Sequence, residues 1–378
     1  MKITRFARLF SQLTLQKEGL IIHRTSDNNP LHHTKEHESQ FYNVPDQTFK
    51  KIFQFGGVPD QYLEQMRLFR EQAILIRQPA LELMGLLERT NFQNPTIRYL
   101  IYGHHGTGKS LTMSHLVHYA FCKDWILVHV PWAPYWTRLI KEIVPSVSRP
   151  GRLDQPTHAV KFLQRFFVQN EELLTRLNLK VSQTYTWSKR EQTSEGSPIV
   201  DVIEQGINRP KYSSDCVAVL LKELKLAANE SKCKVFMAVD GVNALFLDKT
   251  NLKKEDYSYA TPSELTLLRA VRNMLNNDWR GGAVVTTVDK WGMRADQRPT
   301  ASHLPRHLLG KEGWECLDPF YPVEVSNYTE KEFLSTLDYL KEKNWIQHPQ
   351  ALTEEGRDQL AFLSGFNPLQ LQYIVDAL

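Results

Sequence analysis

Long hydrophobic runs are missing from this sequence of 378 residues, although 42% of its residues are hydrophobic. No apolar stretch approaches the roughly 20 residues that a membrane-spanning helix needs, so the sequence predicts no membrane insertion. Internal repeats and low-complexity tracts are missing as well, which excludes a repeat architecture. A chain of this length can bury a large core, and we expect one large domain with a smaller one.

Cysteine is scarce, and no two cysteines form a C-x-x-C pair. The four cysteines are Cys122, Cys216, Cys233 and Cys316. This wide spacing argues against a zinc cluster or a disulfide framework and favours a reducing compartment. The excess of basic over acidic residues is also small, with a net charge of +4 and a pI near 8.7. Such a charge permits contact with RNA but does not predict it.

The most informative feature present is a glycine-rich segment that matches G-x-x-x-x-G-K-[ST]. In such a loop the glycines let successive backbone N–H groups point at phosphate oxygens, the lysine reaches the β- and γ-phosphates, and the serine hydroxyl binds Mg²⁺. The predicted nucleotide-binding residues are Gly103, His104, His105, Gly106, Thr107, Gly108, Lys109, Ser110 and Leu111, with His104 and His105 contributing only backbone N–H groups.

The residues on both sides of this loop favour a real nucleotide site over a chance match. Residues 97–102 form a short apolar and aromatic run typical of a buried strand, and residues 110–122 contain no Gly or Pro and have helical periodicity. The order strand, loop, helix places the helix N-terminus, with its partial positive charge, at the phosphates.

Further strands and helices alternate along the chain. Residues 125–130, 235–240 and 283–288 are apolar runs typical of buried strands, and a helix capped by Ser263 is expected over residues 263–279. A helical pattern, interrupted at residues 76–79, also covers residues 59–89. This alternation predicts an α/β fold with a parallel sheet and helices on both faces. Ligands of such sheets bind at the carboxyl ends of the strands.

Asp240 ends one of these strands and is the predicted Mg²⁺ ligand beside Ser110. The alternative role is capping of a helix in a strand-to-helix turn. The next residue is Gly241, where fast P-loop ATPases usually carry an acid that activates water. A general base contributes about 10²- to 10⁴-fold, so we expect slow hydrolysis. Three acids of the following loop are possible substitutes, although solvated surface acids are the simpler interpretation: Asp248, Glu255 and Asp256.

Other polar residues near the predicted strand ends have two interpretations each. Thr286 and Thr287 are candidates for contacting a γ-phosphate or a water, but threonine is also simply a good strand former. An arginine finger, if there is one, would come from the group Arg294, Arg298 and Arg306, for which surface or RNA-facing charge is the favoured alternative. No N/T-K-x-D guanine motif occurs, and Asp289-Lys290 has the wrong order. The sequence of the site therefore does not indicate whether the nucleotide is ATP or GTP.

The two ends of the chain differ from its centre. Residues 1–17 contain basic but no acidic residues and have apolar residues at helical spacing, as in a mitochondrial presequence; a plain basic helix is the alternative. The polar stretch up to Val44 is expected to be a solvated tail rather than a metal site built from His32, His33 and His37. Residues 181–215 read as a polar insertion with its own strand and turn, and helices follow from Thr329.

Several blocks of sequence resemble the death-associated protein three family, the GTP-binding protein of the mitochondrial small ribosomal subunit. The similar segments run from about residue 50 to the C-terminus. They include residues 99–103, 106–109, 187–191, 196–198, 204–207, 239–245, 277–279, 281–282 and 309–313.

The resemblance implies a P-loop NTPase of AAA+-like type with a helical lid. Its domains would be a presequence and flexible extension (1–45), a nucleotide-binding domain (46–325) and the lid (326–378). It also implies bound GTP or GDP with Mg²⁺, with the base near Leu75, Ile76 and Arg77. The Gly-x-Asn-Pro turn of such lids often precedes a sensor arginine, but Leu369 and Gln370 follow the turn here.

The location implied is the mitochondrial matrix, in the head of the small subunit. The expected partners are ribosomal proteins and rRNA, with a possible contact to the large subunit across the interface. The leading hypothesis is a structural ribosomal component with at most slow GTPase activity. The alternatives are an active AAA+-type NTPase that acts on a partner and, from the family's name and history alone, an apoptotic signalling adaptor.

Overall fold

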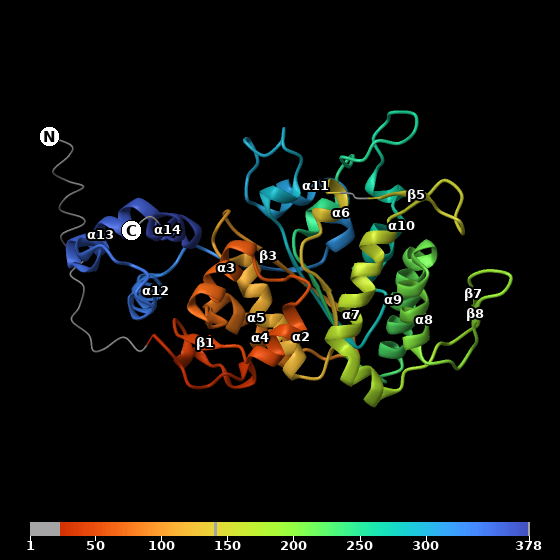
Figure 1. Cartoon of the computed structure of the whole chain (residues 1–378), viewed down its shortest axis with the longest axis horizontal. Coiled ribbons are helices and arrows are strands. Elements are labelled where there is room, and N and C mark those ends of the chain that lie inside the picture. The colour runs from red at the N-terminus through yellow and green to blue at the C-terminus, as the bar shows by residue number, and fades with distance from the viewer. Residues whose placement is uncertain (1–22, 140–141, 377–378) are drawn as a thin grey trace.

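A five-stranded parallel sheet forms the centre of the protein in the computed structural model, which describes residues 23–139 and 142–376 (Figure 1). The strands lie in the order β11-β3-β10-β9-β4. They are β3 (Ile97–Tyr102), β4 (Ile126–Val130), β9 (Val235–Val239), β10 (Gly282–Thr287) and β11 (Tyr321–Glu324). The first four are the predicted apolar runs. Strand β11 was missed because it is a short edge strand containing Pro322, with only Val323 buried.

Helices cover both faces of the sheet, which confirms the predicted α/β class. Along β9, Val235, Met237 and Val239 pack into one core, whereas Phe236 and Ala238 pack into the other. The first core includes α7 (Pro156–Leu177), α8 (Ile199–Asn208), α9 (Ser213–Asn229), α10 (Thr266–Met274) and α11 (Pro305–Leu317). The second core includes α2 (Asp46–Phe53), α3 (Asp60–Phe69), α4 (Gln78–Arg89) and α5 (Lys109–Cys122).

Short elements connect these layers. They are the helix α6 (Tyr135–Arg138), the strand pairs β5 (Val144–Pro145) with β6 (Leu153–Asp154) and β7 (Tyr185–Thr186) with β8 (Gln192–Thr193), and the 3₁₀ turns η1 (Pro30–His32), η2 (Lys35–His37), η3 (Pro210–Tyr212), η4 (Val242–Phe246), η5 (Pro262–Glu264), η6 (Lys290–Gly292) and η7 (Pro349–Leu352).

Residues 23–44 pack onto the domain, so the expectation of a solvated tail is wrong for this part. Strand β1 (Phe41–Asn43) pairs antiparallel with β2 (Ala73–Leu75), a strand inside the segment interpreted as helical. Tyr42 and Val44 are buried against α5, and His33 contacts His115 of that helix through ring nitrogens 2.9 Å apart. Pairing between such short distant segments leaves little periodic signal. The predicted presequence lies outside the described residues.

Two local expectations also need correction. The polar segment 181–215 does contain a hairpin, β7–β8, but its second part is α8, whose Val202 and Ile203 are fully buried in the main core. The helix expected to begin at Ser263 is α10, which begins at Thr266 after Leu265 and has no side-chain cap, whereas Thr261 forms a capping box with Glu264 at the separate turn η5. In both places a short polar run precedes the helix, so the sequence pattern did not show at which residue the buried helical positions begin.

Three helices form the C-terminal unit at one end of the molecule, opposite the β7–β8 hairpin (Figure 1). They are α12 (Glu330–Glu342), α13 (Glu354–Ser364) and α14 (Pro368–Val375). Thr329 and Thr353 cap the first two as predicted. The helices share a hydrophobic cluster with Phe41, Ala73 and Leu75, so the β1–β2 pair joins them to the sheet domain. Among the described residues, no helix has the length and apolarity that a membrane span requires.

Candidate functional site

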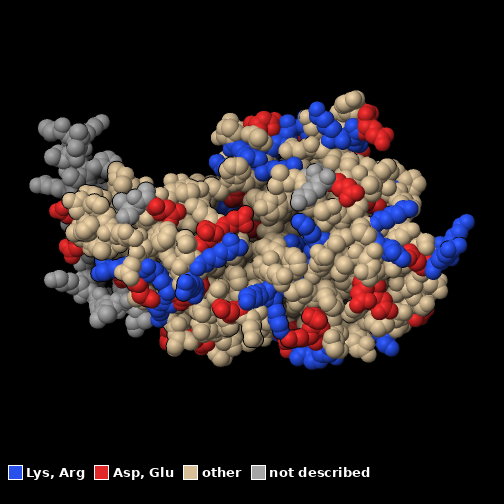
Figure 2. All heavy atoms as spheres, in the orientation of Figure 1, with Lys and Arg blue, Asp and Glu red and all other residues tan. Residues whose placement is uncertain are grey.

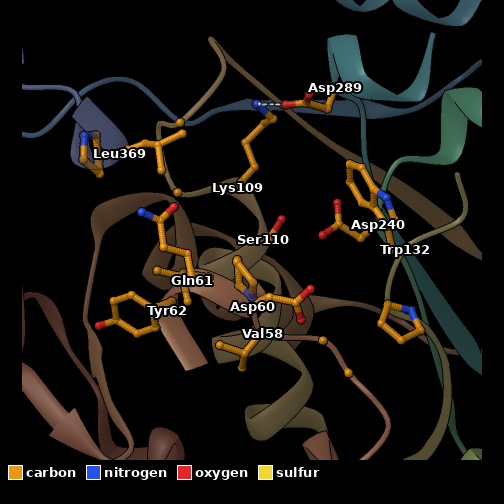
Figure 3. Close-up of a pocket in the computed structure, with 18 of the residues that line it drawn as sticks. Val58, Asp60, Gln61, Tyr62, Lys109, Ser110, Trp132, Asp240, Asp289 and Leu369 are labelled. Carbon is orange, nitrogen blue, oxygen red and sulfur yellow. Dashed lines mark ion pairs between the residues drawn. The ribbon is translucent and has the colours of Figure 1, made fainter. Parts of the chain in front are cut away.

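The glycine-rich loop connects β3 to α5 at the carboxyl end of the sheet (Figure 3). Gly106 and Gly108 have φ angles of +82° and +95°, which glycine adopts without steric cost. A Cβ atom at Gly106 would lie 2.7 Å from both Asn367 Oδ1 and Leu369 Cβ. Helix α5 begins directly at Lys109, so its free N–H groups face the concave side of the loop.

The ammonium of Lys109 uses all three of its donors. Its Nζ atom lies 3.1 Å from Gly103 O, 2.7 Å from His104 O and 2.7 Å from Asp289 Oδ2. Burial would raise the pKa of Asp289, but hydrogen bonds from His105 and the charge of Lys109 lower it below its ordinary value. Sequence reasoning had considered Asp289 only as part of a guanine motif. Its position two residues after β10, at the same edge as the loop, was the available signal.

Ser110 and Asp240 face each other across the site, as the sequence predicted (Figure 3). Asp240 follows β9 and is 5% exposed, and Thr287 of the neighbouring strand donates a hydrogen bond to its Oδ1. Burial raises the pKa of Asp240 to about 6, although hydrogen bonds from Ser110 and Thr287 partly oppose this rise. A buried carboxylate that lacks full charge compensation, next to a hydroxyl, suits a hard cation such as Mg²⁺.

The raised pKa of Asp240 predicts a pH dependence. Because the folded pKa of about 6 exceeds the ordinary 3.8, this carboxyl alone makes folding less favourable as pH rises from 4 to 7. Cation binding has the opposite sign, because it requires the ionised form. We expect Mg²⁺-dependent nucleotide affinity to fall about tenfold per pH unit below pH 6, as measured by calorimetry. Asp240→Asn should abolish this dependence, and a pH-independent wild type would contradict the assignment.

Gly241 has no room for the acid that fast ATPases carry after the metal-binding aspartate. Its φ is +73°, and a Cβ atom there would lie 2.8 Å from Pro134 Cδ and 3.4 Å from a ring carbon of Trp132. Its N–H donates to Thr287 Oγ1 at 2.8 Å. Thr287 therefore positions Asp240 and the turn after it, whereas Thr286 donates to Tyr99 O at 3.2 Å within the sheet.

The three arginines considered from the sequence contact other side chains and do not line the cavity at the glycine-rich loop. Arg294 pairs with Asp248 at 3.1 Å and with Asp296 at 2.8 Å. Arg298 lies over the Trp291 ring at 4.5 Å, and Arg306 lies over Trp314 at 5.7 Å. None of these three arginines is among the described residues that line the cavity at the loop. Two remaining acids lie on an exposed loop, Glu255 and Asp256.

A cavity of about 880 Å³ opens beside the loop. On the side away from Asp240 it is lined by Val58, Gln61 and Tyr62 at the start of α3 and by Leu369 of the C-terminal unit (Figure 3). Trp132, with Asp240, lines the opposite side. Sequence reasoning missed residues 58–62, although the turn Gly56-Gly57-Val58-Pro59 directly before a helix was a visible signal.

Leu75, Ile76 and Arg77, predicted to border the base, do not line this cavity. Leu75 belongs to β2, and Ile76 is fully buried in the core. The Arg77 side chain is 7% exposed and forms a double hydrogen bond with Glu332 of α12, at 2.9 and 3.0 Å. It also donates to the loop carbonyl of Thr107 at 2.5 Å. Arg77 therefore ties the loop to the C-terminal helices.

The turn before α14 contacts the glycine-rich loop through two hydrogen bonds. Asn367 Nδ2 donates to His105 O at 3.0 Å, and the Leu369 N–H donates to Gly106 O at 3.2 Å. Leu369 thus lies against the loop. The absence of a sensor arginine after this turn stays a prediction from the sequence, where Leu369 and Gln370 follow Pro368.

Known proteins resemble this chain over most of its length. The small ribosomal subunit protein mS29 of Mus musculus is 43% identical over 94% of this chain and 90% of its own length. Its counterpart in Bos taurus is 43% identical over 92% of this chain and 86% of its own length. Among solved structures, an Escherichia coli HORMA:CdnC:Trip13 complex aligns with a TM-score of 0.30 and 10% identity, covering 86% of this chain and 80% of the matched chain.

A family model described as mitochondrial ribosomal death-associated protein 3 matches residues 74–373. That span contains the glycine-rich loop, all five strands of the central sheet and most of the C-terminal unit. Together with the mS29 relatives, it confirms the resemblance found in the sequence, and the chain belongs to the mitochondrial ribosomal death-associated protein 3 family.

Proposed function

We propose that this protein is a structural component of the mitochondrial small ribosomal subunit that holds a guanine nucleotide with Mg²⁺ and hydrolyses it slowly or not at all. Family membership gives a mitochondrial, ribosome-associated location. The ribosomal part of the proposal is supported by the names of the two mammalian relatives. Its partners would be ribosomal proteins and rRNA, with contact to the large subunit as a further possibility.

The fold supports a P-loop NTPase of AAA+-like type. The loop follows β3, which is a central strand between β11 and β10, and it leads into α5. Asp240 ends β9, which is separated from β3 by β10. The C-terminal unit contacts the loop through Arg77, which connects Glu332 of α12 to Thr107, and through Asn367 before α14, an arrangement that suits a lid.

The residues around the loop fit a nucleotide. Backbone N–H groups of residues 103–111 and the Lys109 ammonium would hold the phosphates. Ser110 and Asp240 would hold Mg²⁺, which supplies charge that neutralises the phosphate oxygens. The segment 58–62 and Leu369 would border the base instead of residues 75–77, because they line the cavity.

The proposal of slow hydrolysis is supported most by the lack of space for a side chain at Gly241. A glutamate there would place its Cβ against Pro134 and Trp132 and would require a positive φ, so the fold disfavours a general base at this position, where the sequence also lacks one. Without that base, hydrolysis should be about 10²- to 10⁴-fold slower than in an ATPase that has one.

The test is to isolate small ribosomal subunits from mitochondria and identify the nucleotide that they release on denaturation. We expect one guanine nucleotide per copy of the protein, and an empty site or ATP would overturn the proposal. Multiple-turnover hydrolysis should remain near the uncatalysed background with the assembled subunit. Rapid turnover that is lost in Lys109→Ala would instead identify an active NTPase.

A further inference from the structure

The segment between β10 and α11, residues 288–304, contacts the glycine-rich loop at three points. Asp289 pairs with Lys109, and its Oδ1 lies 3.5 Å from His105 Nδ1. Trp291 Nε1 donates to His105 Nε2 at 3.2 Å. The ring of His303 lies 3.8 Å from that of His104, between centroids. His104 and His105 occupy the variable positions of the motif, so this chain uses them to contact residues 288–304.

Asp289 also determines the local structure of this segment. Its Oδ1 accepts the N–H of Trp291 at 2.9 Å and caps η6. Asn243 holds its backbone in place by donating to Asp289 O at 2.9 Å and accepting from Asp289 N at 3.2 Å. The backbone of Asp289 is therefore fixed, while its side chain connects Lys109 on one side to Trp291 on the other.

A phosphate at the loop would compete with Asp289. An ammonium has three donors, and the three of Lys109 are given to Gly103 O, His104 O and Asp289. A phosphate oxygen that binds Lys109 must displace one of them. The carboxylate is the partner that loses most, because it carries the same charge as the phosphate and both would lie in a poorly solvated site.

We propose that Asp289 is an internal competitor for the nucleotide and couples nucleotide binding to the conformation of residues 288–304. This inference rests on the proposed function, since it assumes that the loop binds phosphates. When a phosphate takes Lys109, the Asp289 side chain turns away and no longer caps η6, so Trp291 and His303 lose their contacts with the loop.

The outer side of this segment carries exposed apolar side chains and partly exposed basic ones, so the change would alter a surface. Trp291 is 45% and Leu304 52% exposed, and Arg298 lies over the Trp291 ring at 4.5 Å. Figure 2 shows Lys and Arg side chains, with Asp and Glu among them, along the upper edge of the molecule, around α11. Lys290, Arg294, Arg298 and Arg306 belong to the segment or to the start of α11. Nucleotide binding would thus change the surface that a ribosomal neighbour contacts at this edge.

The first test measures GDP affinity by calorimetry in the full chain with Mg²⁺. Asp289→Asn keeps an oxygen that can cap η6 but removes the charge, so we expect GDP to bind about tenfold more tightly. Asp296→Asn is the matched control, because Asp296 is in the same segment but is 62% exposed and pairs with Arg294 away from the loop, and it should bind GDP as the wild type does. An unchanged or weaker affinity in Asp289→Asn would overturn the proposal.

The second test uses the wild type, so it does not depend on the folding of a variant. Amide hydrogen exchange in residues 289–303 should become at least several-fold faster when GDP and Mg²⁺ are added, while exchange in the loop, residues 103–110, slows. Equal exchange of residues 289–303 with and without GDP, despite slower exchange in the loop, would reject the coupling alone. If the loop shows no response and calorimetry shows no binding, the proposed function fails as well.

Discussion

Replacing Arg77 with alanine is expected to lower the free energy of unfolding by about 3–5 kcal/mol. The guanidinium is buried with the carboxylate of Glu332, and it also donates to the carbonyl oxygens of Thr107, Ser326 and Asn327. Without Arg77, the Glu332 carboxylate stays buried without its cation and three carbonyl groups lose a donor. The loss should appear as a lower urea midpoint, with the α12–α14 unit separating from the sheet domain.

Two further variants separate the ion pair from general effects of mutation. Arg89→Ala removes an exposed arginine at the C-terminal end of α4, the helix that directly follows Arg77, and should change stability by less than about 0.5 kcal/mol. Arg77→Met combined with Glu332→Leu removes both charges, and should recover most of the stability that Arg77→Ala loses. A small effect of Arg77→Ala would mean that the other contacts of the C-terminal helices hold them in place without this ion pair.

Arg77 is an example of a residue whose contacts could not be predicted from the sequence. Its position before a helix suggested a residue near the base, but its partner Glu332 lies 255 positions away. Nothing local in the sequence announces an ion pair of that kind. Strand β2 lies in the same stretch and was not predicted, because three apolar residues between two helical patterns form a strand only by pairing with β1.

The parts predicted correctly are those that local sequence determines. Strands β3, β4, β9 and β10 are continuous apolar runs, because both faces of a covered parallel sheet are buried. The glycine positions of the loop and the caps Thr329 and Thr353 follow from backbone geometry within a few residues. Asp289 and residues 58–62 were missed because their roles depend on what the fold places beside the loop.

Replacing Lys109 with alanine should weaken nucleotide binding about 100-fold, since a charged hydrogen bond to phosphate contributes about 1.5–3 kcal/mol and the loop also loses its ammonium charge. The same change has a second effect, because Asp289 would remain as a buried carboxylate without its cation. We therefore expect Lys109→Ala also to lower the free energy of unfolding by about 3–5 kcal/mol. Nucleotide affinity is measured by calorimetry and stability by urea denaturation.

The double variant Lys109→Ala/Asp289→Asn distinguishes these two effects. It removes the unpaired charge, so stability should return toward that of the wild type, whereas nucleotide affinity should stay low because the loop still lacks its ammonium. Lys311→Ala, at a side chain that is 88% exposed, is the control for general loss of positive charge and should leave both quantities unchanged. If the double variant regained nucleotide affinity as well, Lys109 would serve only to neutralise Asp289, and its assignment as a phosphate ligand would be wrong.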